Sequence, residues 1–157
     1  MRQLITQRDA RETPPEMPTE EQARAEFSKL VEAHERDAKD PDWGPTSTAM
    51  LEASLRAESQ RGMFSTVSVD CRTTTCVATL EWTSPEAAEQ RSRWVAAAPL
   101  ATNCSRQLRL SDAPGGDGPR RAVLLLDCAD WRAEGSQPLR LGTDADVAPR
   151  SGEPSAL

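Results

Sequence analysis

Two pairs of cysteines, each placed to close a β-hairpin, constrain the fold of this chain more than any other feature of its sequence. Cys71 and Cys76 bracket a four-residue turn between two stretches in which polar and apolar residues alternate. Side chains alternate between the two faces of a strand, so a register with the cysteines opposite each other gathers the apolar residues on the cysteine face. We therefore predict strands over residues 64–71 and 76–82, joined by a disulfide. This register also predicts the pairs Val69–Ala78, Val67–Leu80 and Ser65–Trp82.

The second pair, Cys104 and Cys128, flanks a second predicted hairpin. Its strands cover residues 104–111 and 120–128, and a loop rich in glycine and proline joins them. Placing these cysteines opposite each other again gathers apolar residues on the cysteine face. The last strand carries apolar residues on its other face as well, which indicates a central strand or one covered on both sides. The register predicts the pairs Leu108–Leu124, Leu110–Ala122 and Arg106–Leu126.

The first predicted helix precedes both hairpins. It begins at Thr19, which forms a capping box with Gln22, and it ends near Ala38. Its apolar stripe is thin, which leaves open whether the helix docks on the domain or on a partner. The stripe consists of Ala23, Phe27, Leu30, Val31 and His34.

Two further helices are predicted from their caps. The second helix follows a turn-rich segment that contains Trp43, and one of the hydroxyl residues over 46–48 serves as its N-cap. Gly62 is expected to end this helix in the left-handed conformation. The third helix starts after the N-cap Ser84 and ends before Pro99.

Together these elements predict an α+β fold. A four-stranded antiparallel sheet, built from two disulfide-closed hairpins, carries two helices on one face, and the N-terminal helix is an extra element. We expect a single domain over residues 19–132. The proline-containing segment over 1–18 is predicted to be a flexible linker or tether, and residues 133–157 a disordered or peripheral tail.

The charge and the cysteine content limit the cellular compartment and the classes of partner that this chain can have. The net charge of -6 argues against nucleic-acid binding, which needs a basic surface. No window approaches the roughly 20 apolar residues of a membrane span, so we expect no direct membrane insertion in this segment. Cysteine pairs at hairpin positions are typical of an oxidising compartment, although no signal peptide is visible after Met1. We therefore expect a periplasmic or extracellular protein whose leader or membrane anchor lies upstream of this segment.

The cysteines are expected to be structural rather than redox-active or metal-binding. The sequence has no C-x-x-C unit, which is typical of thioredoxin-like redox sites and of many zinc sites. His34 is the only histidine, and its place on the apolar stripe predicts half-buried packing rather than catalysis. No nucleophile–base pair, phosphate-binding loop or calcium loop is recognisable. We predict no catalytic residues, no metal and no cofactor.

The candidate partner-binding residues fall into two groups. Trp43 and Trp131 lie at the predicted borders of the domain, and Phe27 lies on the stripe of the first helix. Exposed tryptophans are frequent anchors at interfaces. The second group is Arg120 and Arg121, which the second hairpin places near two further arginines. These are solvated charges on a sheet edge or, alternatively, a site for an acidic protein face or a phosphate-bearing envelope polymer.

One stretch of the sequence resembles known proteins. Trp43 and the segment from Val67 to Val77, with the pattern Val-Asp-Cys-Arg-x-x-x-Cys, resemble uncharacterised exported or lipoprotein domains of Gram-negative, myxobacteria-like bacteria. The resemblance covers about a third of the chain. It implies a setting in the cell envelope and carries over no activity and no functional residue.

These observations predict a protein that binds another protein. The first hypothesis is a non-enzymatic binding domain of the bacterial cell envelope, serving as an accessory subunit of a membrane-anchored assembly. The second is a periplasmic or secreted inhibitor or immunity protein, in which the loop over residues 112–119 plugs a target enzyme. An enzyme and a structural spacer are the third and fourth hypotheses, and no motif supports the enzyme.

Overall fold

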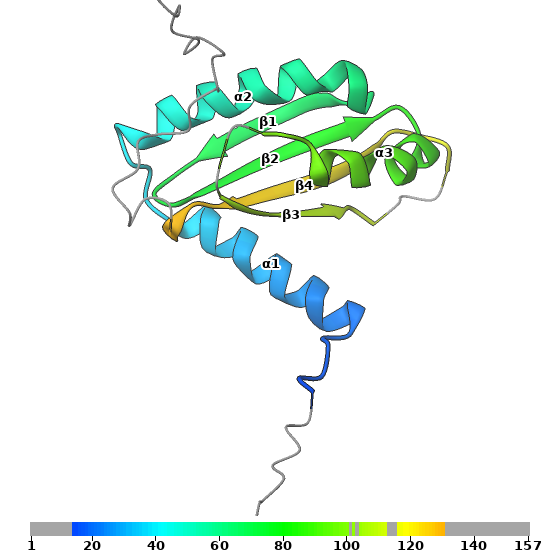
Figure 1. Cartoon of the computed structure of the whole chain (residues 1–157), viewed down its shortest axis with the longest axis horizontal. Coiled ribbons are helices and arrows are strands. Elements are labelled where there is room, and N and C mark those ends of the chain that lie inside the picture. The colour runs from blue at the N-terminus through cyan, green and yellow to red at the C-terminus, as the bar shows by residue number, and fades with distance from the viewer. Residues whose placement is uncertain (1–13, 101, 103, 113–115, 131–157) are drawn as a thin grey trace, which may run out of the picture.

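The computed structural model describes residues 14–100, 102, 104–112 and 116–130. In these residues three helices and four strands follow one another in the order α1, α2, β1, β2, α3, β3, β4 (Figure 1). This arrangement confirms the predicted α+β fold. The elements are α1 Glu20–Arg36, α2 Trp43–Gly62, β1 Ser65–Cys71, β2 Thr75–Trp82, α3 Pro85–Ala97, β3 Ser105–Leu110 and β4 Arg120–Asp127.

The predicted linker and tail lie mostly outside the described residues. Residues 1–13 of the predicted linker, the whole predicted tail over 133–157 and Trp131 fall outside them. The helices and strands of the described part all fall within the predicted domain over 19–132. None of these helices is both long enough and apolar enough to cross a lipid bilayer.

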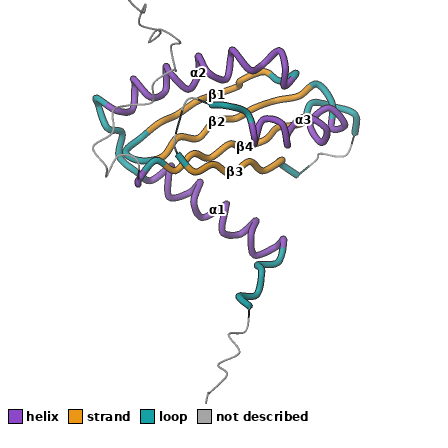
Figure 2. Tube along the Cα trace, viewed as in Figure 1, coloured by secondary structure: helices purple, strands orange, loops and turns teal. Residues whose placement is uncertain are grey.

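The four strands form one antiparallel sheet in the order β1-β2-β4-β3 (Figure 2). β4 therefore lies inside the sheet, and β1 and β3 form its two edges. Leu124 and Leu125 are neighbours on β4 and so face opposite sides of the sheet, yet both are buried. Their burial confirms that the fourth strand is central and covered on both faces.

Both predicted disulfides are present. Cys71 is bonded to Cys76 directly across the β1–β2 turn, and Cys104 is bonded to Cys128. The observed register of β3 and β4 contains all three pairs that the sequence predicts. The two disulfides lie at the same end of the sheet, because the start of β2 pairs with the end of β4.

A β-bulge corrects the predicted register of the first hairpin. The strands pair as predicted from the disulfide to Val69, but the register shifts between Thr66 and Ser68. Val67 is the extra residue, and it exposes 46% of its surface. An inserted residue reverses the alternation beyond it, so two of the predicted pairs are wrong. The observed pairs there are Thr66–Leu80 and Ser65–Glu81, in place of Val67–Leu80 and Ser65–Trp82.

The main hydrophobic core lies between the sheet and the helices α2 and α3. α2 packs along β1, and α3 packs on β3, β4 and β2 (Figure 1). Trp82 is fully buried there, and its indole N–H donates to the carbonyl oxygen of Gly62 at 2.9 Å. The sheet contributes the apolar residues of the cysteine face, which are Cys71, Cys76, Ala78, Leu80, Ala122, Leu124 and Leu126.

The helix α1 packs on the opposite face of the sheet. His34, near the end of α1, contacts Asp70 and Thr75, which alternate with the cysteines and so point away from the main core. Phe27 and Leu125 expose only 6% and 3% of their surfaces, and neither belongs to the main core cluster. The first helix therefore docks on the domain itself, which the sequence left open.

The predicted helix ends are partly right. The capping box at the start of α1 is present. α2 begins at Trp43, ahead of the predicted caps, and the Asp40 carboxylate accepts the backbone N–H of Trp43 at 2.8 Å. At its other end Met63, rather than Gly62, adopts the left-handed conformation, with φ of 53°. Gly62 supplies space instead, since a Cβ there would lie 2.5 Å from the Phe64 ring.

Candidate functional site

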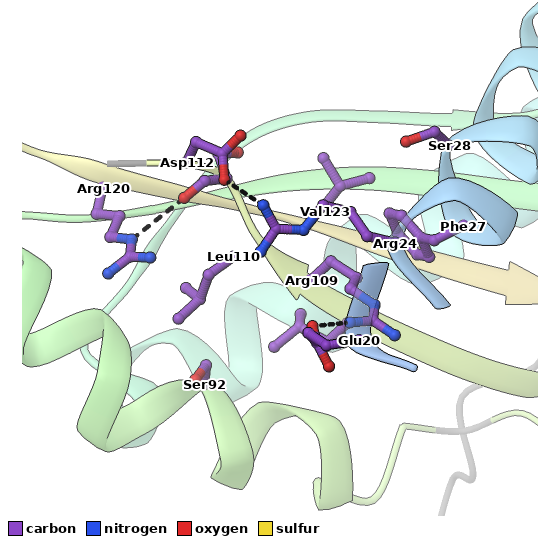
Figure 3. Close-up of a pocket in the computed structure, with 12 residues that line it drawn as sticks. Glu20, Arg24, Phe27, Ser28, Ser92, Arg109, Leu110, Asp112, Arg120 and Val123 are labelled. Carbon is purple, nitrogen blue, oxygen red and sulfur yellow. Dashed lines mark hydrogen bonds and ion pairs between the residues drawn. The ribbon is translucent and has the colours of Figure 1, made fainter. Parts of the chain in front are cut away.

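A cavity of about 460 Å³ lies beside the edge strand β3, with walls from α1, α3 and the start of β4 (Figure 3). This volume falls within the roughly 300–1,000 Å³ that is typical of ligand sites. Five of its twelve lining residues are charged, whereas small-molecule sites are mostly apolar. The walls therefore suit a charged partner. They are formed by Glu20, Arg24, Phe27, Ser28, Ser92, Leu108, Arg109, Leu110, Ser111, Asp112, Arg120 and Val123.

Two ion pairs connect α1 to the β3 side of the cavity. The Arg109 guanidinium lies 2.7 Å from the Glu20 carboxylate, and the Arg24 guanidinium lies 2.8 Å from the Asp112 carboxylate (Figure 3). The two carboxylate side chains are 74% and 86% exposed. Exposed pairs of this kind are typically worth only about 0–1 kcal/mol, so other carboxylates can replace these two at little cost.

Arg120 reaches the cavity from the other side of β3. It lies on the same face of β4 as Ala122 and Leu124, so it points toward α3. Its guanidinium bonds the Ser111 carbonyl oxygen at 3.3 Å and the Glu89 carboxylate of α3 at 2.9 Å. Because only 16% of this side chain is exposed, Arg120 braces the cavity wall.

The backbone of β3 offers hydrogen-bonding groups along the cavity. The N–H of Ser111 donates to the carbonyl oxygen of Arg121 on the β4 side at 2.9 Å. In an antiparallel edge strand the N–H and C=O groups of successive residues point alternately to the partner strand and to the other side. The backbone groups of Arg109, two residues before Ser111, therefore also point to β4. Leu108 and Leu110 therefore direct their N–H and C=O groups away from β4, to an edge that no strand of the described residues covers. We call this the open edge of β3. An edge of this kind can pair with another strand.

The other edge of the sheet, β1, is less open. The bulge at Val67 interrupts its pairing, and bulges twist an edge away from further pairing. The hydroxyl oxygen of Thr48 accepts the outward N–H of Cys71 at 3.1 Å. A second cavity of about 410 Å³ lies between this strand and α2. Of the two edge strands that the structure describes, β3 alone combines an unbroken register with a cavity beside it.

A polar cluster joins the end of α1 to the disulfide turn. The side chain of His34 is 3% exposed, and its Nε2 lies 3.1 Å from the Asp70 carboxylate, while its Nδ1 lies 2.7 Å from the Thr75 hydroxyl. Arg72 donates to the same carboxylate at 2.7 Å and to two backbone carbonyls at the end of α1, at 2.6 and 3.0 Å. The turn that carries the first disulfide thus holds the end of α1.

The environment of this cluster favours the neutral form of His34 and the ionised form of Asp70. Burial lowers the pKa of His34, although the hydrogen bond and charge of Asp70 act in the opposite direction. Burial alone would raise the pKa of Asp70, but hydrogen bonds from Arg72 and His34, with the charges of Arg72 and Lys39, outweigh it and lower that pKa. An ionised carboxylate only accepts hydrogen bonds, so His34 donates from Nε2 and accepts the Thr75 hydroxyl proton at Nδ1.

Thr75, His34 and Asp70 are the group types of a hydrolytic triad, but their arrangement is that of a structural contact. In a serine-type triad the nucleophile bonds Nε2 and the carboxylate bonds Nδ1, and here the two positions are exchanged. The Asp70 carboxylate is also shared with Arg72 and with Lys39, whose Nζ lies 3.4 Å away. None of the three residues lines either of the two cavities. The sequence predicted half-buried packing of His34; the side chain is in fact fully buried, and its partners were missed.

The predicted partner-binding residues lie in different environments. Trp43 is 3% exposed and belongs to the main core, so its interpretation as an exposed anchor is wrong. It is buried because α2 begins at this residue rather than after it. Phe27 is also buried, and it contributes to the wall of the β3 cavity. Arg121 lies on the opposite face of β4 from Arg120 and pairs with Glu81 at 2.7 Å.

The structure divides the arginines of the second hairpin between the two faces of the sheet. Arg109 and Arg120 line the cavity from opposite sides, whereas Arg106 bonds the Ala98 carbonyl oxygen and Arg121 lies outside the cavity. Strand alternation could have predicted this division. Arg24 was missed, because nothing in the local sequence shows that α1 lies beside β3.

Comparison with known proteins adds no assignment, since no protein-family model, curated protein or solved structure matches the chain. The disulfides indicate an oxidising, extracytoplasmic environment. All four cysteines are engaged in them, so none offers a thiolate to a metal or a substrate. Within the described part of the chain, no three His, Cys, Asp or Glu side chains are grouped to hold a metal ion.

Proposed function

We propose that this chain is a non-enzymatic protein-binding domain of the bacterial cell envelope and an accessory subunit of a membrane-anchored assembly. It binds another envelope protein at the β3 surface, which we define as the open edge at Leu108 and Leu110 together with the cavity residues Arg24, Arg109 and Arg120. A tether preceding α1 holds the domain near the membrane.

The observation that carries this proposal is the open edge of β3 beside a charged cavity. Natural sheets usually blunt their edges by bulges, capping contacts or short length, as the β1 edge is blunted at Val67 and Thr48. β3 instead keeps six residues in unbroken register. Arginine is one of the residues enriched at protein interfaces, and it supplies directional donors to carboxylates.

The setting is supported by the two disulfides. It also agrees with the expectation from the sequence pattern over Val67 to Val77. Disulfides persist in the periplasm and outside the cell, where an accessory subunit would meet its partners. They also stabilise the sheet whose edge forms the proposed surface, because β3 and β4 lie within the loop closed by Cys104 and Cys128.

Site-specific photo-crosslinking tests the proposal. A benzoylphenylalanine replaces Leu110 on the β3 edge in one variant and Val67 on the β1 edge in the control. Each variant is incubated with an envelope extract of the source organism, irradiated and examined by mass spectrometry. We expect one protein to be crosslinked from position 110 and not from position 67.

Charge variants show whether the crosslink depends on the β3 surface. Arg109→Glu should remove the crosslink, because Arg109 lines the cavity. Arg121→Glu makes the same change in charge outside the cavity and should leave it unchanged. Equal crosslinking from both edges, or a crosslink that survives Arg109→Glu, would contradict the proposed surface. A captured enzyme whose activity the domain blocks would favour the inhibitor hypothesis.

A further inference from the structure

We infer that the partner presents an extended strand, in which acidic and apolar residues alternate, and that this strand pairs with β3 as a fifth strand of the sheet. The inference rests on the proposed function and names the partner chemistry that the β3 surface selects. It follows from three properties of that surface: the direction of its backbone groups, the different side chains on its two faces and the exchangeable ion pairs across it.

The backbone of β3 determines how a strand is held. Leu108 and Leu110 direct their N–H and C=O groups outward, as the Ser111–Arg121 hydrogen bond establishes through the alternation of the ladder. Main-chain pairing with an edge gives affinity, and the alternate side chains of the added strand give specificity. The spacing between Leu108 and Leu110 matches one repeat of a strand, so both residues bind the same extended segment.

The two faces beside β3 differ in chemistry. Arg109 points to the face covered by α1, where Arg24 also lines the cavity. Leu108 and Leu110 point to the other face, beside Ser92 of α3, and both are only partly buried. Arg120 lies on this second face too, but its side chain is only 16% exposed and is already paired with Glu89. The added strand shares the pleat of β3, so every second side chain meets arginines and the intervening ones meet leucines. Acidic residues fit the first set of positions and apolar residues the second.

The arginines are held in place by partners that can be exchanged. Glu20 and Asp112 pair with Arg109 and Arg24 in this structure, but these carboxylates belong to highly exposed side chains. A carboxylate of the incoming strand can replace each of them without leaving a buried charge unpaired. The alternative is that the arginines only keep other strands away from this edge. That role would need neither a cavity beside the edge nor partly buried leucines facing the cavity.

The probe for this mode is a fluorescein-labelled peptide with the sequence Val-Asp-Val-Asp-Val-Asp-Val, titrated with the full chain and followed by fluorescence anisotropy. We expect saturable binding, and no binding of the matched Val-Lys-Val-Lys-Val-Lys-Val peptide. Two N-methylated versions of the acidic peptide test the main-chain pairing: one is methylated at the three aspartates and the other at the valines. The N–H groups of the aspartates and those of the valines point to opposite edges of the extended peptide, so only one version loses the N–H groups that face β3. One of these two N-methylated peptides should therefore fail to bind, and the other should bind as the unmodified peptide does.

Protein variants test the side-chain half of the inference. Arg109→Glu should weaken binding of the acidic peptide at least about tenfold, which corresponds to about 1.4 kcal/mol, and should allow the lysine peptide to bind. Arg109→Gln, which is the milder change, should weaken the acidic peptide without admitting the lysine peptide. Arg121→Glu is the matched control, since Arg121 lies outside the cavity, and it should change neither affinity.

The outcomes separate this inference from the proposed function. Strand addition at β3 is overturned if the two N-methylated peptides lose affinity equally, or if Arg109→Glu and Arg121→Glu have equal effects. If the acidic peptide does not bind while crosslinking from position 110 still depends on Arg109, the proposed surface stands and the alternating strand is wrong. If both measurements fail, the surface and its strand are both wrong.

Discussion

Replacing Phe27 with alanine should loosen α1 from the sheet. Phe27 exposes 6% of its surface, while Leu30, three residues further along the same helix, exposes 41%. Phe27 is therefore the apolar anchor of α1 on the face away from the main core, and Leu30→Ala is a matched control on the same helix. The contrast between the two variants isolates docking from any change in helix propensity.

The expected loss follows from the burial of Phe27. A buried aromatic side chain removes about 150–250 Å² from water, and about 25 cal/mol per Å² makes that roughly 4–6 kcal/mol. Alanine retains part of this, and measured Phe→Ala losses in cores are about 3–5 kcal/mol. A single helix covers this site and can relax, so we expect the lower end, about 3 kcal/mol. Leu30→Ala should cost less than about 0.5 kcal/mol, as surface changes usually do.

Urea denaturation and trypsin cleavage after Lys29 measure this loss independently. When opening is faster than cleavage, the cleavage rate follows the population of the open helix, and about 3 kcal/mol corresponds to roughly a hundredfold increase. Leu30→Ala should leave the rate nearly unchanged. If Phe27→Ala loses less than about 0.5 kcal/mol and is cleaved at the wild-type rate, the reasoning that Phe27 docks α1 is refuted.

Four other outcomes are expected. Leu124→Ala, at a fully buried position of β4, should cost about 2–5 kcal/mol in urea denaturation, and an effect near zero would contradict its central position. Gly44→Ala should destabilise because its Cβ would meet a carbonyl oxygen of the disulfide turn at 2.9 Å, whereas Gly118→Ala, which meets nothing within 4 Å, should not. By loop-closure entropy, removing the disulfide of the second hairpin should cost about 3.5 kcal/mol and that of the first about 2 kcal/mol, which denaturation of the two double-serine variants can compare. Burial lowers the pKa of His34 below 6.5, so the unfolded chain binds this proton more tightly. The stability linked to the lowered pKa of His34 is present above pH 6.5 and falls as the pH drops toward that lowered pKa. His34→Gln should remove this dependence of stability on pH, which thermal melts at several pH values can measure.

Local patterns predicted those parts of the fold that depend on neighbouring residues. The capping box at Thr19 and the register around both disulfides follow from rules that act over a few residues, and both were right. The bulge at Val67 was missed, because the alternating sequence continues through it and only packing of the edge strand places the extra residue. The sequence placed Trp43 before the second helix, whereas it is the first residue of α2. The prediction failed because Asp40, rather than a hydroxyl residue, accepts a backbone N–H of the first turn.

The candidate site depends on contacts between distant segments. Arg109 meets Glu20 and Arg24 meets Asp112 across almost ninety positions of the sequence, so no local pattern could indicate the cavity. The sequence did bring attention to the arginines of the second hairpin. It could not show that β3 is an edge strand, because the strand order depends on which hairpins join side by side, and that is decided by packing of the whole core.

The Cys104–Cys128 bond has a mechanical consequence. The two cysteines are 24 positions apart, and both β3 and β4 lie between them. A force that pulls on the two ends of the chain passes from one sulfur to the other and bypasses the intervening residues. Tension on a tethered molecule could strip α1 away or unravel α2 before it could straighten β3. The strand with the open edge is therefore covalently shielded from stretching.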